Sequence, residues 1–107
     1  MRITDIKSLL VPMRASWLSE QLVANPMSIY PSYKEKRSSW YGSLMSAIVV
    51  IQTDVGLQGL GIVGGGKGKL VAPIIEEQFK NLLLGQDPFD IELRWDQMFR
   101  ASVCYGR

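Results

Sequence analysis

The pattern of apolar residues along the chain predicts three β-strands before any helix. The runs that carry this pattern span residues 2–11, 46–53 and 57–63. The last two are rich in Ile, Val and Leu and are separated only by a short turn, so they predict a β-hairpin over residues 46–63. Gly56 in that turn can take the positive φ that a tight hairpin requires. The first run is less regular and ends at Pro12, which cannot donate to a sheet.

Two later segments repeat their apolar residues every three to four positions, which predicts amphipathic helices. The helices are expected at about residues 70–84 and 88–102. Pro73 suits the first turn of the earlier helix, and Gly85 suits the position just beyond its end. Asp87 is expected to cap the later helix, with Pro88 at its first position.

Strands followed by helices indicate an α+β fold. The sequence predicts a three-stranded antiparallel sheet, a meander, followed by two or more helices packed on one face, in a single domain spanning residues 1–107. Gly59 and Gly61 leave one side of the return strand almost bare of side chains. We expect the closing helix to pack against that bare side.

A segment of roughly 30 residues, from Met13 to Tyr41, shows no clean period and is far longer than the usual ~4–6-residue connection. It contains the charged run Lys34–Arg37 among Tyr and Trp residues. Three interpretations of this cluster stay open: a solvated turn, which composition favours, a site for single-stranded nucleic acid, or an arginine that binds a substrate carboxylate.

Two glycine patterns resemble nucleotide-binding motifs. Residues 59–64 match G-x-G-x-x-G, and residues 61–67 match G-x-x-x-x-G-K. The first lies within a predicted hairpin strand instead of opening a helix, and the second is followed by Gly68 instead of a Mg²⁺-binding Ser or Thr. We therefore interpret the glycines as packing residues and residues 64–69 as a mobile loop, whose Lys67 or Lys69 could still meet an anion.

Composition narrows the possible chemistry. The 107 residues have a formal net charge of +2 and contain no histidine and one cysteine, so the commonest general base and a cysteine-cluster zinc site are excluded. Cys104 is interpreted as an inert packing residue. The acidic residues of the closing segment are interpreted as capping and surface residues, with Asp96 paired to Arg100. No apolar run is long enough to span a membrane, so a cytoplasmic location is expected.

Taken together, these segments resemble the N-terminal capping domain of the enolase superfamily, in its mandelate racemase and muconate lactonizing subgroup. The matching stretches are residues 3–7, 49–61, 85–92 and 95–98, and the resemblance covers nearly the whole chain. A narrower similarity, in residues 25–30 and 37–39, is to acid-sugar dehydratases of the rhamnonate dehydratase type.

The resemblance implies a function. In that family the cap precedes a (β/α) barrel, where carboxylates hold Mg²⁺ and a base removes the proton α to a substrate carboxylate before water is eliminated to give a 2-keto-3-deoxy acid. The cap closes the barrel with two loops, here an early specificity loop at about residues 13–41 and the glycine-rich loop at residues 64–69. Arg37 matches the early-loop arginine that contacts substrate. The early-loop histidine of rhamnonate-type enzymes has no counterpart, because this chain has no histidine.

The barrel is absent from these 107 residues, so we expect the chain alone to hold no metal ligand, catalytic residue or cofactor and to be inactive. Mg²⁺, an acid-sugar substrate, the barrel domain as partner and a homo-oligomeric state are expected of the longer parent. The alternative is a small basic module that binds an anion or a nucleic-acid strand through Lys34, Lys36, Arg37 and residues 64–69. The net charge of only +2 counts against it. A stand-alone interaction domain is a third possibility.

Overall fold

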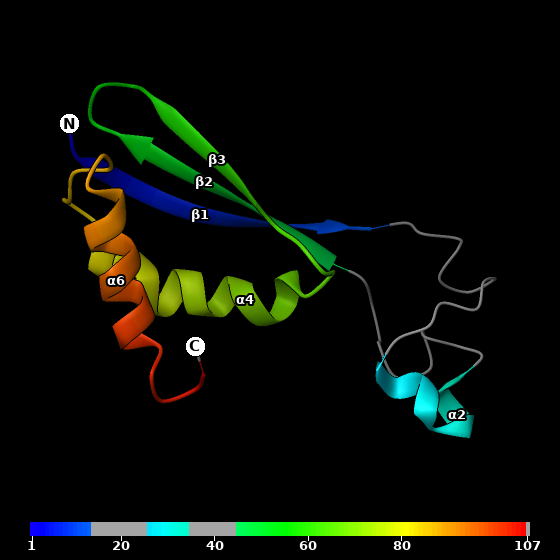
Figure 1. The fold of residues 1–107 in the computed structure, drawn as a ribbon. Coiled ribbons are helices and arrows are strands. Elements are labelled where there is room, and N and C mark those ends of the chain that lie inside the picture. The colour runs from blue at the N-terminus through cyan, green and yellow to red at the C-terminus, as the bar shows by residue number, and fades with distance from the viewer. Residues whose placement is uncertain (14–25, 35–44, 107) are drawn as a thin grey trace.

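The computed structural model describes residues 1–13, 26–34 and 45–106. Its sheet consists of β1 (Ile3–Pro12), β2 (Met45–Thr53) and β3 (Gln58–Val63), in the order β1-β2-β3 with antiparallel neighbours. A helical run follows, made of α4 (Gly68–Ile74), the π-helical η2 (Ile75–Phe79) and α5 (Lys80–Leu83), and α6 (Ile91–Ala101) comes last. These helices lie under one face of the sheet (Figure 1). The predicted α+β meander with helices on one face is confirmed.

The hairpin forms as predicted. Gly56 has a φ of 81°, and the N–H of Thr53 donates to the carbonyl of Leu57 at 3.1 Å. From this closure the register of β2 and β3 runs without a shift, pairing Gln52 with Gln58 and Ala47 with Val63.

The core lies between the helices and the face of β1 and β2 that they cover. Its buried cluster contains Ile3, Ile6 and Leu83, of which Ile6 is only 1% exposed. Partly buried apolar side chains surround the cluster; they are Val49, Ile51, Ile75, Phe79, Leu82 and Met98. Ile6 pairs with Ile51 across the sheet, so both strands present apolar residues to the same side.

The end of the helical run is tied directly to the first strand. Gly85 has a φ of 76°, as expected for the residue just beyond a helix end. Its N–H donates to the carbonyl of Ile3 at 2.8 Å, and the N–H of Ile3 donates to the carbonyl of Gln86 at 2.9 Å. These two bonds fix where the helical layer meets β1.

The sequence-based helix boundaries differ from the structure in two places. The helical run begins at Gly68, two residues before the predicted start, so Pro73 lies inside α4 and not in its first turn. Pro73 cannot donate a helical hydrogen bond, and the helix widens into the π-helical η2 two residues later. In the segment expected to be a loop, η1 (Pro26–Ile29) and α2 (Pro31–Lys34) form two short helical turns that pack on each other.

The closing helix also starts later than predicted. α6 begins at Ile91, and the predicted cap Asp87 closes a separate turn, accepting a bond from the N–H of Phe89 at 3.0 Å. Asp90 occupies the N-cap position without a side-chain cap bond. The prediction was wrong because Asp87 satisfies the nearer backbone N–H, as Asp does in an Asx turn.

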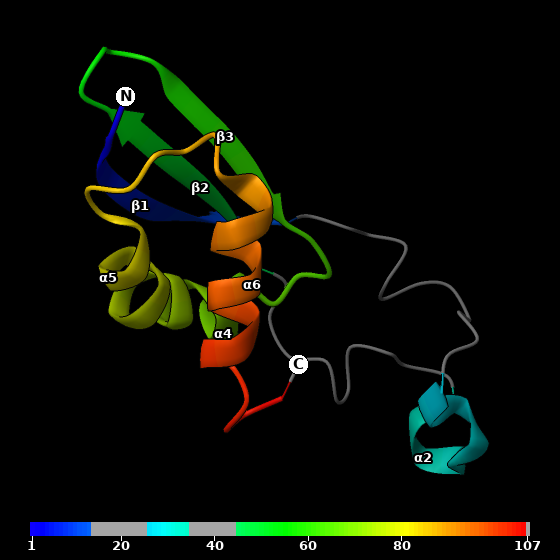
Figure 2. The same ribbon diagram turned by 60° about the vertical axis from the view of Figure 1, so that its left-hand side comes forward.

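The expected contact between the closing helix and the glycines of β3 is not formed. A Cβ placed on Gly59 or Gly61 would have no heavy atom within 4 Å, so that side of β3 is open. The helical layer instead contacts β1 and β2 (Figure 2). The apolar face of α6 reaches the core through Met98 and leaves the hairpin edge uncovered.

An ion-pair network joins β1 to the helical run. The ammonium of Lys80 lies 2.8 Å from Asp5 Oδ1 and 3.9 Å from Glu76 Oε2, and Glu76 Oε1 accepts the N–H of Ser8 at 2.6 Å. The hydrogen bond from Lys80 holds the pKa of the Asp5 carboxyl below its ordinary value of 3.8. The same bond raises the pKa of Lys80 above 10.5.

The ion pair between Asp5 and Lys80 makes the free energy of unfolding fall as the solution becomes acidic. A lowered carboxyl pKa means that the contribution of Asp5 is present above pH 3.8 and is lost as the pH falls through the folded-state value. We expect Asp5→Asn to lower the free energy of unfolding at pH 7, because Asn keeps the oxygen that accepts from Ile6 N–H but loses the charge. Urea unfolding at several pH values measures this, and the difference from the unsubstituted chain should shrink in acid.

The matched control is Asp96→Asn, which breaks the exposed Asp96–Arg100 ion pair on α6. Exposed pairs of this kind contribute about 0–1 kcal/mol, so only a small change is expected. An Asp5→Asn effect that does not diminish below pH 3.8 would contradict the assignment of the network.

Candidate functional site: a loop junction at one end of the sheet

Three chain segments meet at the end of the sheet opposite the hairpin turn. Met45, the first residue of β2, pairs with Pro12 at the end of β1 and forms a parallel bridge with Lys67 on its other side. The N–H of Met45 donates to the carbonyl of Gly66 at 3.1 Å. We call Met45, Ser46, Gly66, Lys67 and Gly68 the loop junction; it lies where β3 runs into α4 (Figure 1). Pro12 and Met45, which flank the predicted early loop, therefore lie close to residues 66–68 of the glycine-rich loop.

Close backbone packing builds the junction. A Cβ on Gly68 would lie 2.5 Å from the carbonyl carbon of Ser46 and 2.7 Å from the N of Ala47, so only glycine fits at the start of α4. The hydroxyl of Ser46 donates to the carbonyl of Val63 at 2.6 Å, which holds the end of β3 against β2. Gly65 and Gly66 take φ values of 73° and 67°, which non-glycine residues rarely adopt. The loop interpreted as mobile from its sequence is thus anchored at several backbone positions.

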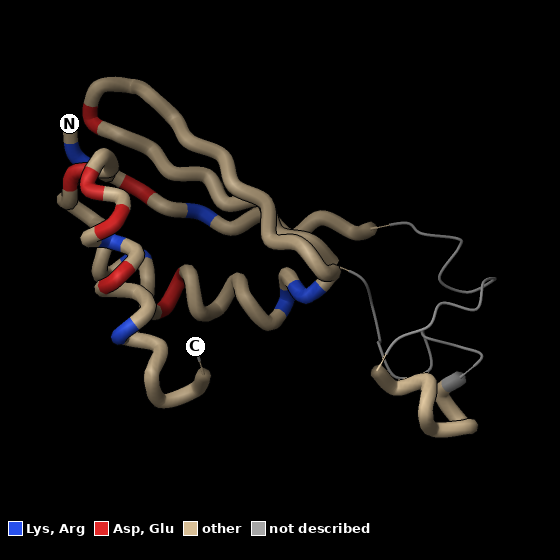
Figure 3. The backbone as a smooth tube through the Cα atoms, in the orientation of Figure 1, with Lys and Arg blue, Asp and Glu red and all other residues tan. Residues whose placement is uncertain are grey.

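The charge near the junction is positive. Lys67 and Lys69 are the ionisable residues of the glycine-rich loop, whereas the acidic residues of the described chain lie along the helices and toward the other end of the sheet (Figure 3). Lys69 is exposed and Lys67 is half-buried. An anionic ligand approaching this end would meet positive charge.

The residues predicted for substrate or nucleic-acid contact fall mostly outside the described residues. Arg37 and Lys36 lie in that undescribed part of the chain, and Lys34 is the last residue of α2. The candidate role of Arg37 therefore stays a prediction. Tyr30, one of the aromatic residues beside the charged run, is half exposed in the turn between η1 and α2.

The described residues do not fit a Mg²⁺ site. No group of three His, Cys, Asp or Glu side chains in residues 1–13, 26–34 and 45–106 could hold a metal ion. Two carboxylates of α6 and its N-cap pair with arginines: Asp90 lies 3.4 Å from Arg94, and Asp96 lies 2.8 Å from Arg100. The predicted Asp96–Arg100 pair is confirmed.

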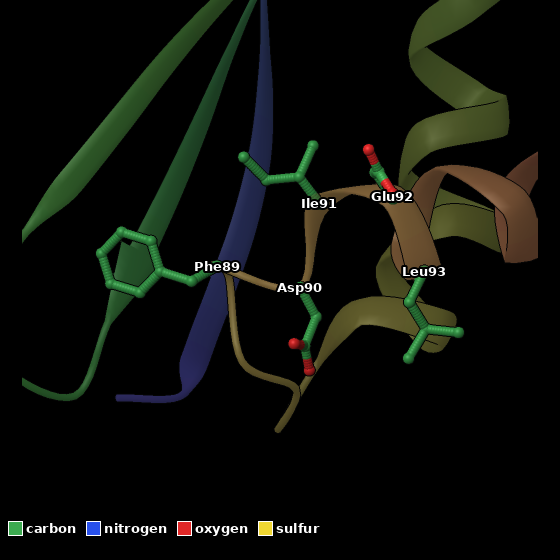
Figure 4. A pocket seen from close by; sticks show the side chains of 5 residues that line it. All are labelled: Phe89, Asp90, Ile91, Glu92 and Leu93. Atoms are coloured by element: carbon green, nitrogen blue, oxygen red, sulfur yellow. The ribbon is translucent and has the colours of Figure 1, made fainter.

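The hollows on the helical side are unsuited to a polar substrate. One, of about 640 Å³, is lined by the consecutive residues Phe89 to Leu93, whose side chains spread in different directions (Figure 4). Another, of about 220 Å³, lies where α6 meets the sheet and is lined mostly by apolar residues, including Ile51, Trp95 and Met98. Neither brings polar groups from several elements onto one point, as a specific polar site does.

Four large apolar side chains around the start of α6 are exposed, and they point in different directions. We call Phe89, Ile91, Leu93 and Trp95 the α6 apolar surface; each is at least half exposed, and Phe89 is 73% exposed. The ring of Trp95 stacks on Phe99, with centroids 4.9 Å apart and an interplanar angle of 12°. The exposed Trp95 and Phe89 are apolar area that another protein region could cover.

The structure also tests the interpretations of Cys104 and of the glycine motif in β3. Cys104 is exposed and so is not the packing residue that was expected. The motif-like glycines 59–63 lie in an antiparallel strand, which excludes a strand-to-helix phosphate loop there. In the described ranges, no helix is long and apolar enough to cross a membrane.

Sequence reasoning missed the loop junction itself. Ser46 and Met45 carry no motif, and their roles depend on residues about 20 positions away. The one available signal was the density of glycines at 64–68, because closely approaching backbones require residues without side chains.

Comparison with known proteins identifies relatives of this chain. The structure of L-rhamnonate dehydratase from Gibberella zeae superimposes on 99% of this chain with a TM-score of 0.82 and 32% sequence identity. The Mg-complexed structure of rhamnonate dehydratase from the same organism gives a TM-score of 0.82 at 29% identity. A putative L-rhamnonate dehydratase from Caldivirga maquilingensis is 38% identical over 86 residues.

The chain is homologous to L-rhamnonate dehydratases of the enolase superfamily. The predicted resemblance is confirmed. The chain spans 21% of the Caldivirga protein and 26% and 29% of the two Gibberella structures, so it corresponds to a small part of each dehydratase. No family model matches the chain.

The close backbone contact at Gly68 predicts that a larger residue there destabilises the fold. We expect Gly68→Ala to lower the free energy of unfolding by about 1–3 kcal/mol, because the added methyl meets the backbone of Ser46 and Ala47. Alanine has the better helix propensity, so a purely local effect would have the opposite sign. Urea unfolding followed by far-UV circular dichroism measures the change.

Gly64→Ala is the matched control, because a Cβ at Gly64 would have nothing within 4 Å. Its expected effect is within about 0.5 kcal/mol. Equal effects of the two substitutions would show that the junction does not need its glycine.

Proposed function

We propose that this chain is the substrate-capping and specificity domain of a Mg²⁺-dependent acid-sugar dehydratase of the L-rhamnonate dehydratase type, and that it is inactive alone. The observation that carries the proposal is the superposition of 99% of the chain on only 26% of an L-rhamnonate dehydratase.

The geometry of the loop junction supports a capping role. A cap closes a site with loops that project from one side, and here Pro12, Met45 and the glycine-rich loop meet at one end of the sheet. Anchoring the loop bases to β2 orders them before substrate arrives, which reduces the entropy lost on closure. The positive Lys67 and Lys69 suit a substrate that carries a carboxylate.

The α6 apolar surface is the proposed docking face for the barrel domain. Phe89, Ile91 and Trp95 would leave water when such a domain packs against them. At roughly 25 cal/mol for each Å² of apolar area, burial of such side chains would favour domain contact.

In this proposal the chain's own residues bind and enclose substrate. Arg37 would form a two-bond contact with the substrate carboxylate or its hydroxyls, which orients the sugar acid. The loops would exclude water from the reacting carbon, which strengthens the electrostatic interactions inside the site. Removal of the α proton and loss of the β-hydroxyl would be carried out by groups of the barrel, with the metal that it binds.

A chimera tests the proposal. The aligned part of the Caldivirga maquilingensis protein is replaced by this chain, and formation of a 2-keto-3-deoxy acid from L-rhamnonate and related sugar acids is measured with Mg²⁺. We expect the chimera to turn over a sugar acid and the 107-residue chain alone to show none. Turnover by the isolated chain, or a folded chimera with no activity on any sugar acid, would contradict the proposal.

Arg37→Ala in the chimera tests the specificity role. Loss of a two-bond contact to a carboxylate is expected to raise KM by about tenfold or more, since a charge-assisted bond contributes about 1.5–3 kcal/mol. Lys36→Ala, which removes a neighbouring positive charge, is the control and should leave KM within about twofold. Equal effects of both substitutions, or salt-dependent oligonucleotide binding by the chain that Arg37→Ala abolishes, would favour the alternative basic module.

A further inference from the structure

The two edges of the sheet differ in how their backbone groups are protected. β1 and β3 are both edge strands, because the strand order is β1-β2-β3. Exposed edges pair readily with other chains unless charges, bulges or prolines block them. The structure therefore allows a direct comparison of a blocked edge with an open one.

β1 is blocked by several of these features. Its register shifts between Ile3 and Asp5, and it ends in Pro12. Side-chain carboxylates also accept hydrogen bonds from its backbone. The N–H of Ile6 donates to Asp5 Oδ1 at 2.9 Å, and the N–H of Ser8 donates to Glu76 Oε1 at 2.6 Å. Another strand could pair there only by displacing these bonds.

β3 has none of these protections. Its six residues, Gln58–Val63, include no charge and no proline, and its pairing with β2 has no register shift. Thr53 and Leu57 form a bonded pair, since the N–H of Thr53 donates to Leu57. Because bonded and non-bonded pairs alternate in an antiparallel ladder, Gln58, Leu60 and Ile62 direct their N–H and C=O groups away from β2. No bond from another described residue to these three groups is present.

The side chains of β3 agree with an uncovered edge. Leu60 and Ile62 are 74% and 76% exposed on the sheet face away from the helices. On the helical side, Gly59 and Gly61 leave open space. A strand could approach this edge without meeting a bulky group on either face.

The central residues of the edge, Gly59-Leu60-Gly61, read the same in both directions, and this favours a second copy of the chain as the occupant. A two-fold axis at Leu60 would place Leu60 opposite Leu60, Gly59 opposite Gly61, and Gln58 opposite Ile62. The apolar leucines then meet on the open face, and the glycines leave room between the two helical layers. All three outward-directed residues find backbone partners in this one register.

We propose that two copies of this chain associate through antiparallel pairing of β3 about a two-fold axis at Leu60, which gives one continuous six-stranded sheet. The interface follows from the edge alone and does not depend on the dehydratase assignment. Its failure would leave the proposed function untouched, and the reverse also holds.

Cross-linking tests the register. Chains carrying Gly59→Cys and chains carrying Gly61→Cys are prepared with Cys104→Ser, which removes the exposed native thiol. Opposed residues at a non-bonded pair have Cα atoms about 4.5 Å apart, within disulfide range. Under mild oxidation we expect the mixture to form more covalent dimer than either chain alone, since same-site cysteines lie out of register.

Two substitutions at Leu60 test whether its outward backbone N–H bonds to the second copy. Leu60→Pro removes the outward N–H without removing a bond to β2, whereas Leu60→Val keeps that N–H and the strand preference. Sedimentation velocity over a range of concentrations should show dimerisation weakened by about tenfold or more in Leu60→Pro and little changed in Leu60→Val. Circular dichroism confirms that each variant is folded.

Three results would overturn the proposal. The first is a chain that stays monomeric at all concentrations. The second is a dimer in which mixed and same-site cysteines cross-link equally, which would indicate another register or occupant. The third is a dimer that is insensitive to Leu60→Pro but abolished by Val50→Lys on the open face of β2, which would indicate face-to-face stacking of two sheets.

Discussion

The arrangement of this molecule depends on the burial of one face of a small sheet. Ile3 and Ile6 of β1 and Leu83 of α5 form the buried cluster, and two backbone bonds from Ile3 to Gly85 and Gln86 hold the helical layer in place. Because these contacts involve β1 and the end of α5, the helices cover β1 and β2 and leave β3 uncovered. The same constraint determines which apolar surfaces stay exposed, namely the α6 apolar surface and the open side of β3.

The two ends of the sheet are built differently, and this difference carries the functional interpretation. The hairpin turn at one end is closed by Gly56 and local bonds. At the other end, Met45 joins β1, β2 and the glycine-rich loop, and Gly68 lets α4 start directly against the backbone of Ser46. A homologous region in L-rhamnonate dehydratases retains this fold within a much longer chain. Loops that project from a rigid base are well suited to closing over a ligand held by another domain.

Much of the fold could be predicted from the sequence because its signals are local. The Ile- and Val-rich run of β2, the turn glycine Gly56 and the helix-ending Gly85 each act within a few residues, and the structure agrees with them. Boundaries were less predictable where two local solutions compete. Asp87 could cap α6 or close a turn, and the turn, which satisfies the N–H of Phe89, is the one that forms. The site was the least predictable part, since its junction joins residues from distant segments and Arg37 lies outside the described residues.

The sequence by itself determined the α+β order, the hairpin and the amphipathic helices, because periodicity and turn chemistry are properties of neighbouring residues. Its matching stretches also carry the enolase-superfamily resemblance. Only the tertiary structure decided which surfaces meet. It placed the helices under β1 and β2, left the helical side of Gly59 and Gly61 open, exposed Cys104, and brought Met45 onto Gly66 and Lys67. The physical reason is that packing depends on the fit between surfaces far apart in the chain, which a one-dimensional pattern does not encode.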